Sequence, residues 1–309
     1  MEKTNHTLIT EFILLGISDI PEMQIFMFFL FLMIYSITLV GNWGILVIVW
    51  VSPSLHSPMY FLLANLSFVD ICYSTTITPQ SLSHLLMERK TISLKGCAAQ
   101  FFFFAVFGTT ECFLLAVMAF DRHTAICHPL RYMVIMNRRT CLQLVATSYI
   151  GGLVTSAINA GCVFRLSFCG PNMIQHFFCD VVPLLRLSCT AIFFNKILVY
   201  TFSSIITVST VLVIVASYVS IISAVLRIRS TVGRLQAFST CASHFTCVLL
   251  FYGTVFFIYM GSVSSTSQDP DRVVSVFYTT VIPMLNPLIY SLRNRDVKGS
   301  FRRIIACTY

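Results

Sequence analysis

Seven long apolar runs, each followed by a short polar stretch, dominate the pattern of this chain. They occupy roughly residues 24–50, 59–86, 96–121, 140–164, 197–226, 235–260 and 273–292. About 20 apolar residues are enough for a helix to cross the hydrocarbon core of a bilayer. The pattern therefore predicts an all-α membrane protein, a seven-transmembrane helix bundle without a separate soluble domain.

Composition supports a membrane protein rather than a soluble one. The chain has 309 residues, of which 57% are hydrophobic and only 10% are charged, and its mean hydropathy is +0.83. A soluble domain carries about 25% charged residues, so this chain has too few to cover a surface that faces water. We expect a tail over residues 1–23, the helix bundle over 24–292 and a second tail over 293–309.

The distribution of Lys and Arg predicts the orientation of the bundle. Twelve of them fall in the loops on one side and eight in the loops on the other, and with the acidic residues the two sides carry net charges of +10 and 0. Basic loops remain in the cytoplasm, so the N-terminus is expected outside the cell. The positive charge is explained by topology and by contact with anionic membrane lipid, and it gives no reason to expect nucleic acid binding.

The two tails carry signals of their own. Asn5 begins a glycosylation sequon that is usable only if the N-terminal tail is extracellular. That tail lacks the basic start of a cleaved signal peptide, so the first apolar run is expected to remain in the membrane. Near the other end, residues 296–308 alternate basic and apolar side chains, which predicts a short amphipathic helix on the inner membrane face.

Four of the twelve cysteines fall in predicted outer loops or at a helix mouth, namely Cys97, Cys169, Cys179 and Cys189. In an oxidising compartment four cysteines allow three pairings, and spacing alone does not choose among them. The other cysteines are interpreted as small buried hydrophobic residues. No Cys or His spacing suggests a zinc site.

Two carboxylates interrupt the apolar runs, Asp70 in the second and Glu111 in the third. Ionisable residues inside a membrane are costly and usually functional. Neither has a Lys or Arg at comparable depth, so the pair needs a cation, a shared proton or neutralisation by burial. Neutral oxygens from residues such as Asn42 and Asn286 would make the site suitable for Na⁺.

Polar motifs mark the cytoplasmic ends of the third, sixth and seventh runs. Asp121 and Arg122 end the third run, where a charge pair either stays together or separates when a partner competes for the arginine. His244 lies in a small-residue cluster without a catalytic partner and is interpreted as a packed, hydrogen-bonded side chain. In the seventh run Pro283 and Pro287 break the hydrogen-bond ladder beside Asn286, which favours a kinked and movable helix.

These pieces together resemble the olfactory receptor family of rhodopsin-like G-protein-coupled receptors. The matching segments run over the whole chain in the same order: Thr10–Gly16, Gly41-Asn42, Pro58–Asp70, Met118–Tyr132, Ser217-Tyr218, Ala237–His244, and Pro283–Tyr290 continuing to Asn294. The resemblance implies disulfides Cys97–Cys179 and Cys169–Cys189, and a buried sodium site at Asp70 and Glu111, with no other cofactor required. It also implies that Asp121-Arg122 forms a lock on the G-protein side, assisted by Tyr218, His244, Asn286, Pro287 and Tyr290.

The same resemblance places a ligand in the outer half of the bundle. The implied contacts are Phe104, Ala105, Gly108, Thr109, Cys112, Phe202, Ile206, Tyr252, Val255, Phe256, Tyr259 and Thr279. None of them is ionised at neutral pH, so a charged ligand would lose its hydration without a counter-ion. We expect a small, neutral, mostly apolar volatile ligand with one oxygen.

The resemblance further implies a stimulatory, olfactory-type G protein as partner, a rise in cAMP, trafficking chaperones, and the plasma membrane of sensory-neuron cilia as location. Phe120, His123 and Gln236 depart from the residues common in the family, and all three are expected at the cytoplasmic face. These departures bear on the strength of coupling rather than on the fold.

Other classes of membrane protein fit the sequence less well. A retinal protein needs a lysine in the last run, and residues 273–292 contain none. No convergent nucleophile, base or metal ligands indicate an enzyme. A transporter or channel that uses the buried Asp70 and Glu111 pair remains the alternative hypothesis.

Overall fold

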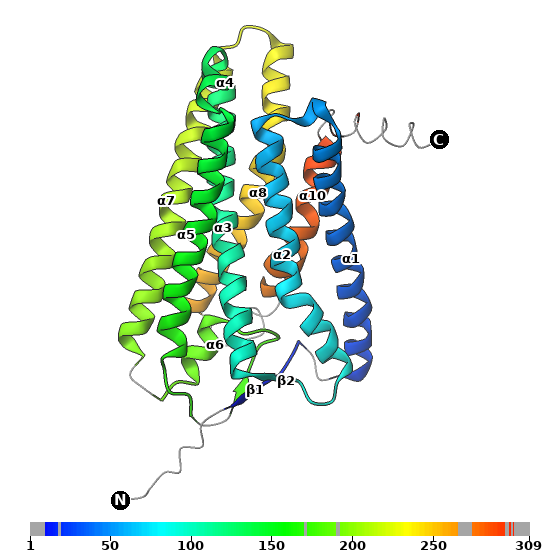
Figure 1. The fold of residues 1–309 in the computed structure, drawn as a ribbon, viewed down its shortest axis with the longest axis vertical. Helices are drawn as coiled ribbons and strands as arrows, with labels where there is room; N and C mark the ends of the chain where they lie inside the picture. The colour runs from blue at the N-terminus through cyan, green and yellow to red at the C-terminus, as the bar shows by residue number, and fades with distance from the viewer. Residues whose placement is uncertain are drawn as a thin grey trace, which may run out of the picture.

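The structure is a computed structural model that describes residues 10–17, 20–169, 172–189, 192–264 and 274–293, together with 297 and 299. Long helices run side by side along the longest axis of the molecule (Figure 1). They are α1 (Pro21–Val51), α2 (Pro58–Leu86), α3 (Leu94–Cys127), α5 (Arg138–Phe164), α7 (Phe193–Leu226) and α8 (Thr231–Ser264), followed by η3 (Phe277–Val281) and α10 (Ile282–Arg293). Short elements fill the connections: η1 (Pro53–Leu55), η2 (Pro129–Arg131), α4 (Tyr132–Ile135) and α6 (Val181–Arg186).

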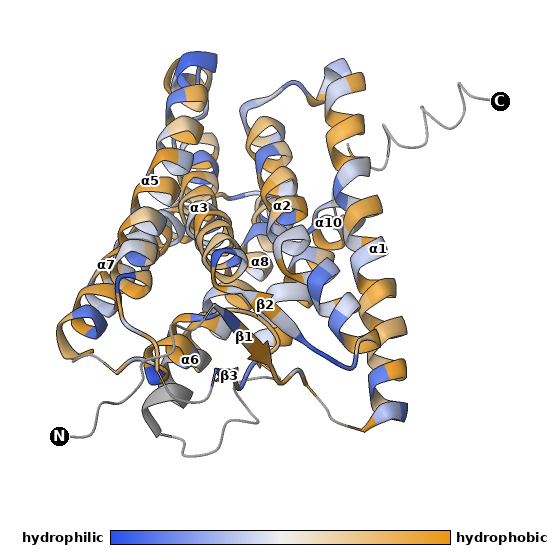
Figure 2. Ribbon diagram, turned by 60° about the horizontal axis from the view of Figure 1, so that its bottom comes forward, coloured by the Kyte–Doolittle hydropathy of each residue, from blue (hydrophilic) through white to orange (hydrophobic). Residues whose placement is uncertain are grey.

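Within the described residues, α1, α2, α3, α5 and α7 are each long and apolar enough to cross a membrane. Two shorter apolar helical stretches, Cys241–Phe257 and Val274–Tyr290, coincide with the sixth and seventh predicted runs. Hydrophobic residues, in orange, make up much of the ribbons of α1 and α7 (Figure 2). The prediction of an all-α membrane bundle is confirmed, whereas most of the predicted amphipathic segment 296–308 lies outside the described residues.

Local sequence explains where the helices begin. Pro21 and Pro58 start α1 and α2, at positions where the missing N–H is not needed. The side chain of Ser93 accepts a hydrogen bond from Gly96 N at 3.1 Å and caps α3, and Asn137 Oδ1 accepts from Thr140 N at 2.9 Å and caps α5. These caps fix where each run of apolar residues enters the bundle.

Small residues allow the closest approaches between helices. A Cβ on Gly41 of α1 would lie 3.0 Å from Pro287 Cγ of α10, and a Cβ on Gly152 of α5 would lie 2.8 Å from Val106 O of α3. Glycine therefore lets these two helix pairs pack closely. In η3 the chain forms a π-helical turn just before Pro283, consistent with the expected distortion of the seventh run.

A three-stranded sheet closes one end of the bundle. Its order is β2-β1-β3, in which β1 (Glu11–Leu14) pairs antiparallel with β2 (Thr91–Ser93) and parallel with β3 (Met173–Ile174). The sheet and α4 lie at opposite ends of the bundle (Figure 1), which we call the sheet end and the α4 end. The strands were not anticipated from the sequence, because each has only two to four residues and no clear alternation.

Buried residues form one large core toward the α4 end and a smaller core at the sheet end, besides a three-residue cluster of Ile77, Phe177 and Phe178. The large core includes Leu62, Leu114 and Leu115, all at most 1% exposed. The smaller core joins Phe12 and Leu14 of β1 to Cys97, Phe101 and Cys179. The strand β1 is therefore part of the packed structure rather than an appendage.

Candidate ligand-binding site

The first turns of α3 anchor the loop that follows α5. The structure joins Cys97 to Cys179 with a Cα–Cα distance of 5.6 Å, and Cys169 to Cys189 with a Cα–Cα distance of 5.7 Å. These are the pairings that the family resemblance implies. The first disulfide attaches the loop to α3, and the second closes the loop on itself.

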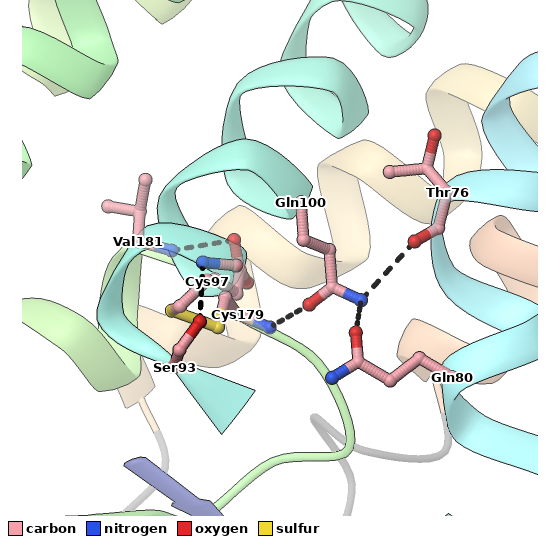
Figure 3. The surroundings of a disulfide bond; sticks show 9 residues. Thr76, Gln80, Ser93, Cys97, Gln100, Cys179 and Val181 are labelled. Atoms are coloured by element: carbon pink, nitrogen blue, oxygen red, sulfur yellow. Dashed lines mark hydrogen bonds between the residues drawn. A yellow bond between two sulfur atoms is a disulfide. The ribbon is translucent and has the colours of Figure 1, made fainter. Parts of the chain in front are cut away.

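Gln100 strengthens this anchor through a single buried amide (Figure 3). Its Nε2 donates to Thr76 O at 3.3 Å and to Gln80 Oε1 at 3.1 Å, and its Oε1 accepts from Cys179 N at 2.9 Å. The side chain is only 6% exposed. One residue thus connects α2, α3 and the disulfide-bonded loop. The sequence analysis did not single out Gln100, and its position one turn after Cys97 is the signal that could have found it.

Next to this loop, between the helices, lies a cavity of about 260 Å³. Its wall comes from α2, α3, α5, α6, α7, α8 and η3, and it includes seven of the predicted ligand contacts: Phe104, Ala105, Gly108, Thr109, Cys112, Ile206 and Val255. The five on α3 share one face because they recur at three- and four-residue steps. The cavity wall is mostly apolar, with scattered hydroxyl and amide groups.

The remaining predicted contacts lie elsewhere. Tyr252 donates its hydroxyl to Thr210 Oγ1 at 2.8 Å, and the fully buried Thr279 donates to Ser275 O at 2.6 Å. The side chains of Phe202 and Phe256 are 39% and 65% exposed, on faces of α7 and α8 that point away from the cavity. The side chain of Tyr259 lies outside the described residues.

Several cavity residues were missed by sequence reasoning. Tyr73, Thr155, Asn159, Ser203 and Thr207 all contribute to the lining. Asp180 also lines the cavity, and its carboxylate accepts from Val181 N at 2.7 Å as the cap of α6. The expectation of a wall without ionisable groups therefore needs correction at Asp180, whose only signal was its place directly after Cys179.

The two buried acids lie deeper in the bundle. Asp70 is fully buried and Glu111 is 2% exposed. Asn286 Nδ2 donates to both carboxylate oxygens of Asp70 at 3.1 Å. Asn42 Nδ2 donates to Pro283 O at 3.1 Å, so α1, α2 and the last helical segment meet through polar side chains. Among the described residues no group of three or more His, Cys, Asp or Glu side chains gathers as a metal cluster.

The α4 end shows a different partner for Asp121 from the one expected. Tyr132 donates its hydroxyl to Asp121 Oδ1 at 2.8 Å, and Asp121 Oδ2 has no hydrogen-bond partner in the described chain. Burial and then the adjacent Asp121 carboxylate raise the pKa of Tyr132 above its ordinary value, so the phenol remains a neutral donor. The Asp121–Arg122 pair is not hydrogen-bonded in this conformation.

His244 connects three helices near Arg122. Its Nε2 lies 3.0 Å from Leu115 O of α3, and its Nδ1 lies 2.8 Å from the hydroxyl of Tyr218 on α7. A carbonyl only accepts, so in the neutral imidazole Nε2 carries the proton and Nδ1 accepts from Tyr218. The interpretation of His244 as a packed, hydrogen-bonded side chain agrees with these contacts.

A helical membrane bundle with a partly apolar cavity beside a disulfide-anchored loop is the architecture expected of a membrane receptor. Comparison with known proteins gives the family. The family model described as "Olfactory receptor" matches residues 31–307. The chain is 53% identical over 305 residues to mouse "Olfactory receptor 5AP2", covering 99% of this chain and 96% of that protein. It is 52% identical over 301 residues to the human protein of that name, covering 97% and 95%.

A third relative, mouse "Olfactory receptor 5AR1", is 50% identical over 305 residues, covering 99% of this chain and 98% of that protein. The chain belongs to the olfactory receptor family. It is a multi-pass membrane protein with a signalling role and no enzymatic one, and the transporter or channel alternative finds no support in these matches.

Proposed function

We propose that this receptor binds a small, neutral, mostly apolar volatile compound in the cavity between α3, α5, α7 and α8. Binding then activates a stimulatory, olfactory-type G protein and raises cAMP. The sheet end faces outward and the α4 end faces the cytoplasm, in accordance with the excess of Lys and Arg in the loops at the α4 end.

The observation that carries the proposal is the cavity itself. A water molecule takes about 30 Å³ of liquid volume, so 260 Å³ corresponds to roughly nine heavy atoms. Burying about ten carbons contributes several kcal/mol of favourable free energy. Association costs part of this through lost translational and rotational freedom, so micromolar rather than nanomolar affinity is expected. A volatile compound has this size.

The signal has a continuous route through packed side chains. Val255 and Phe251 line the cavity on α8, and about two turns further along the same helix His244 contacts α3 and α7. A ligand that prefers one position of α8 shifts the population toward that position. Asp121, Arg122, Tyr218 and Tyr290 are buried in this conformation, and their rearrangement in the activated state then opens the surface that the G protein recognises.

We also propose an allosteric Na⁺ ion bound by Asp70 and Glu111. Asn42 Oδ1 and Asn286 Oδ1 are buried and accept no hydrogen bond among the described residues. An all-oxygen set of ligands suits a small hard cation. The bound ion would supply the positive charge that two buried carboxylates otherwise lack.

The cellular setting follows the same family reasoning. We propose that the receptor functions in the plasma membrane of olfactory cilia, reaches it with trafficking chaperones and carries a glycan on Asn5. Asn5 and the predicted C-terminal helix lie outside the described residues. The tail of residues 1–23, the bundle of residues 24–292 and the tail of residues 293–309 remain our proposed division of the chain.

A cAMP reporter screen of volatile compounds in cells that express the full chain tests the proposal. Val255→Phe narrows the cavity, so the concentration for half-maximal response should rise at least tenfold or the response should disappear. Val215→Phe is the matched control, because Val215 on α7 is 51% exposed and does not line the cavity. Surface staining verifies that both variants reach the membrane.

A potent response that both variants share equally would contradict the proposed cavity. Absence of any response to a broad panel, with normal surface expression and the reporter working for a known receptor, would contradict the proposed function.

A further inference from the structure

Several hydroxyl groups in the wall of the cavity make no side-chain hydrogen bond. Many helical Ser and Thr side chains of the bundle donate to the carbonyl four residues earlier, as Thr110 does to Val106 O at 2.7 Å and Ser148 to Leu144 O at 2.8 Å. Four hydroxyl side chains of the described lining make no hydrogen bond to other described residues: Thr109, Thr155, Ser203 and Thr207. They come from α3, α5 and α7, so three helices contribute uncommitted hydroxyls to the cavity wall.

Asn159 is the buried amide of this wall, and its polar atoms lack hydrogen-bond partners among the described residues. Its side chain lines the cavity and is only 7% exposed, yet its Oδ1 is buried with no hydrogen-bond partner among the described residues. Its Nδ2 likewise makes no hydrogen bond there. Buried amides are normally satisfied, because leaving them unpaired is unfavourable. Because Asn159 Oδ1 has almost no accessible surface, Asn159 offers its Nδ2 donor, and not Oδ1, to whatever occupies the cavity.

Thr155 places a hydroxyl beside this amide. Positions four apart on a helix lie on the same face, so Thr155 and Asn159 of α5 are neighbours. Across the cavity stand apolar residues such as Phe104 and Val255. The site thus has a polar α5 side that donates and accepts, and an apolar side that does neither.

We infer that the preferred ligand of this receptor carries a hydroxyl group, as an alcohol or phenol does, bound between Asn159 and Thr155. This inference rests on the proposed odorant-binding function. A hydroxyl accepts from Asn159 Nδ2 and donates to Thr155 Oγ1, whereas a ketone, ester or ether only accepts and leaves the Thr155 oxygen without a donor. Asp180 in the lining disfavours a carboxylate by like-charge repulsion.

The first arm of the test uses the wild-type receptor and matched ligands. Sets of an alcohol, a methyl ether and a ketone with the same number of heavy atoms, such as 1-octanol, 1-methoxyheptane and 2-octanone, keep size and apolar surface nearly constant. Aromatic and cyclic sets extend the panel, and amines, thiols and acids complete it. We expect alcohols to act at concentrations at least tenfold lower than their matched ethers and ketones, because a site built for a hydroxyl discriminates against analogues that lack it.

The second arm removes the polar wall. Asn159→Leu keeps the size of the side chain and should raise the half-maximal concentration of alcohols at least tenfold while changing that of ethers less than threefold. Thr155→Val should act in the same direction with a smaller effect. Thr147→Val on the same helix is the control, because Thr147 is exposed and its hydroxyl already donates to Gln143 O.

Equal potency of alcohols and ethers on the wild type overturns the inference, and so does an equal loss for every ligand in Asn159→Leu. If Asn159→Leu fails to reach the surface, Thr155→Val and the wild-type comparison decide the question. Activation only by ligands without a hydroxyl contradicts the inference and leaves the proposed odorant-receptor function intact. No response to any member of the panel contradicts both the inference and the proposed function.

Discussion

At the scale of single residues, the hydrogen bond from Tyr132 to Asp121 determines what Arg122 is free to do. Asp121 is 1% exposed and has one oxygen bound by Tyr132, so its charge is already partly satisfied. Arg122 is then available to partners on other helices or on a G protein. Tyr132 precedes the α5 cap by only a few residues. Motion of the segment between α3 and α5 would therefore make or break the hydrogen bond between Tyr132 and Asp121.

Replacing Tyr132 by Phe tests this role. Without the phenol, the Asp121 carboxylate should turn to Arg122, the next donor, and stabilise the resting state. A hydrogen bond to a charged group contributes about 1.5–3 kcal/mol, so basal and agonist-stimulated cAMP should fall about tenfold. The measurement is cAMP normalised to surface receptor.

Tyr35→Phe serves as the comparison, because Tyr35 lies at the exposed surface of the bundle, where its hydroxyl contacts Thr75 Oγ1 at 3.0 Å. Higher basal signalling in Tyr132→Phe than in the wild type would show that the bond stabilises the resting state instead.

At the scale of helices, the closest packing in the bundle depends on Gly152. A Cβ there would lie 2.8 Å from Val106 O, a backbone atom of α3 that cannot rotate away. In an isolated helix Ala is better than Gly by roughly 0.5–1 kcal/mol. Here overpacking should outweigh that gain, since it typically destabilises by about 1–3 kcal/mol.

Gly152→Ala should therefore lower the thermal stability of detergent-solubilised receptor by several degrees and reduce its surface expression. Gly161→Ala is on the same helix with nothing within 4 Å of the added Cβ, so it should be neutral or slightly stabilising. Equal melting temperatures for the two variants would mean that α3 and α5 can separate without loss.

The helices are also where sequence reasoning was most successful. Runs of apolar residues predicted each long helix within a few residues, for example 59–86 against Pro58–Leu86 for α2. Length and hydropathy suffice because the bilayer sets both. The strands β1, β2 and β3 were not predictable in the same way, since long-range partners rather than local pattern create them.

The rotation of a helix about its axis was harder to predict than its extent. On α3 the predicted contacts from Phe104 to Cys112 line the cavity, whereas on α7 Phe202 points outward beside Ser203, which points inward. Neighbouring positions on a helix are about 100° apart. When a helix is apolar on every face, its sequence does not indicate which face turns toward the cavity. Asn159 was not predicted for the same reason. The sequence of α5 alone does not show whether its amide faces the cavity, the lipid or another helix.

At the scale of the whole molecule, polar residues link helices that are distant in sequence. Asn286 contacts Asp70 across 216 residues, and Asn42 contacts Pro283 across 241. An ion held by Asp70 and Glu111 would therefore bias α2, α3 and the last helix together. A ligand shifts a conformational equilibrium only by its difference in affinity for the two states.

Exchange of external sodium for N-methylglucamine at constant ionic strength measures this bias. In the wild type, removing sodium should raise basal cAMP, because by family precedent the ion favours the resting state. Asp70→Asn combined with Glu111→Gln should abolish that dependence. A double variant that still responds to sodium as the wild type does would exclude the pair as the ion site.

The three-stranded sheet has a consequence for the order of events during synthesis. Leu14 of β1 pairs with Ile174, which follows it by 160 residues. A ribosome adds about 5–20 residues per second, so β1 waits on the order of 10–30 s before its last partner exists. During that interval its apolar residues Phe12 and Leu14 have no core to enter, and a nascent chain in this condition is vulnerable to misassembly. The delay sets a time window in which the quality-control machinery of the cell must hold the N-terminal segment until the sheet forms.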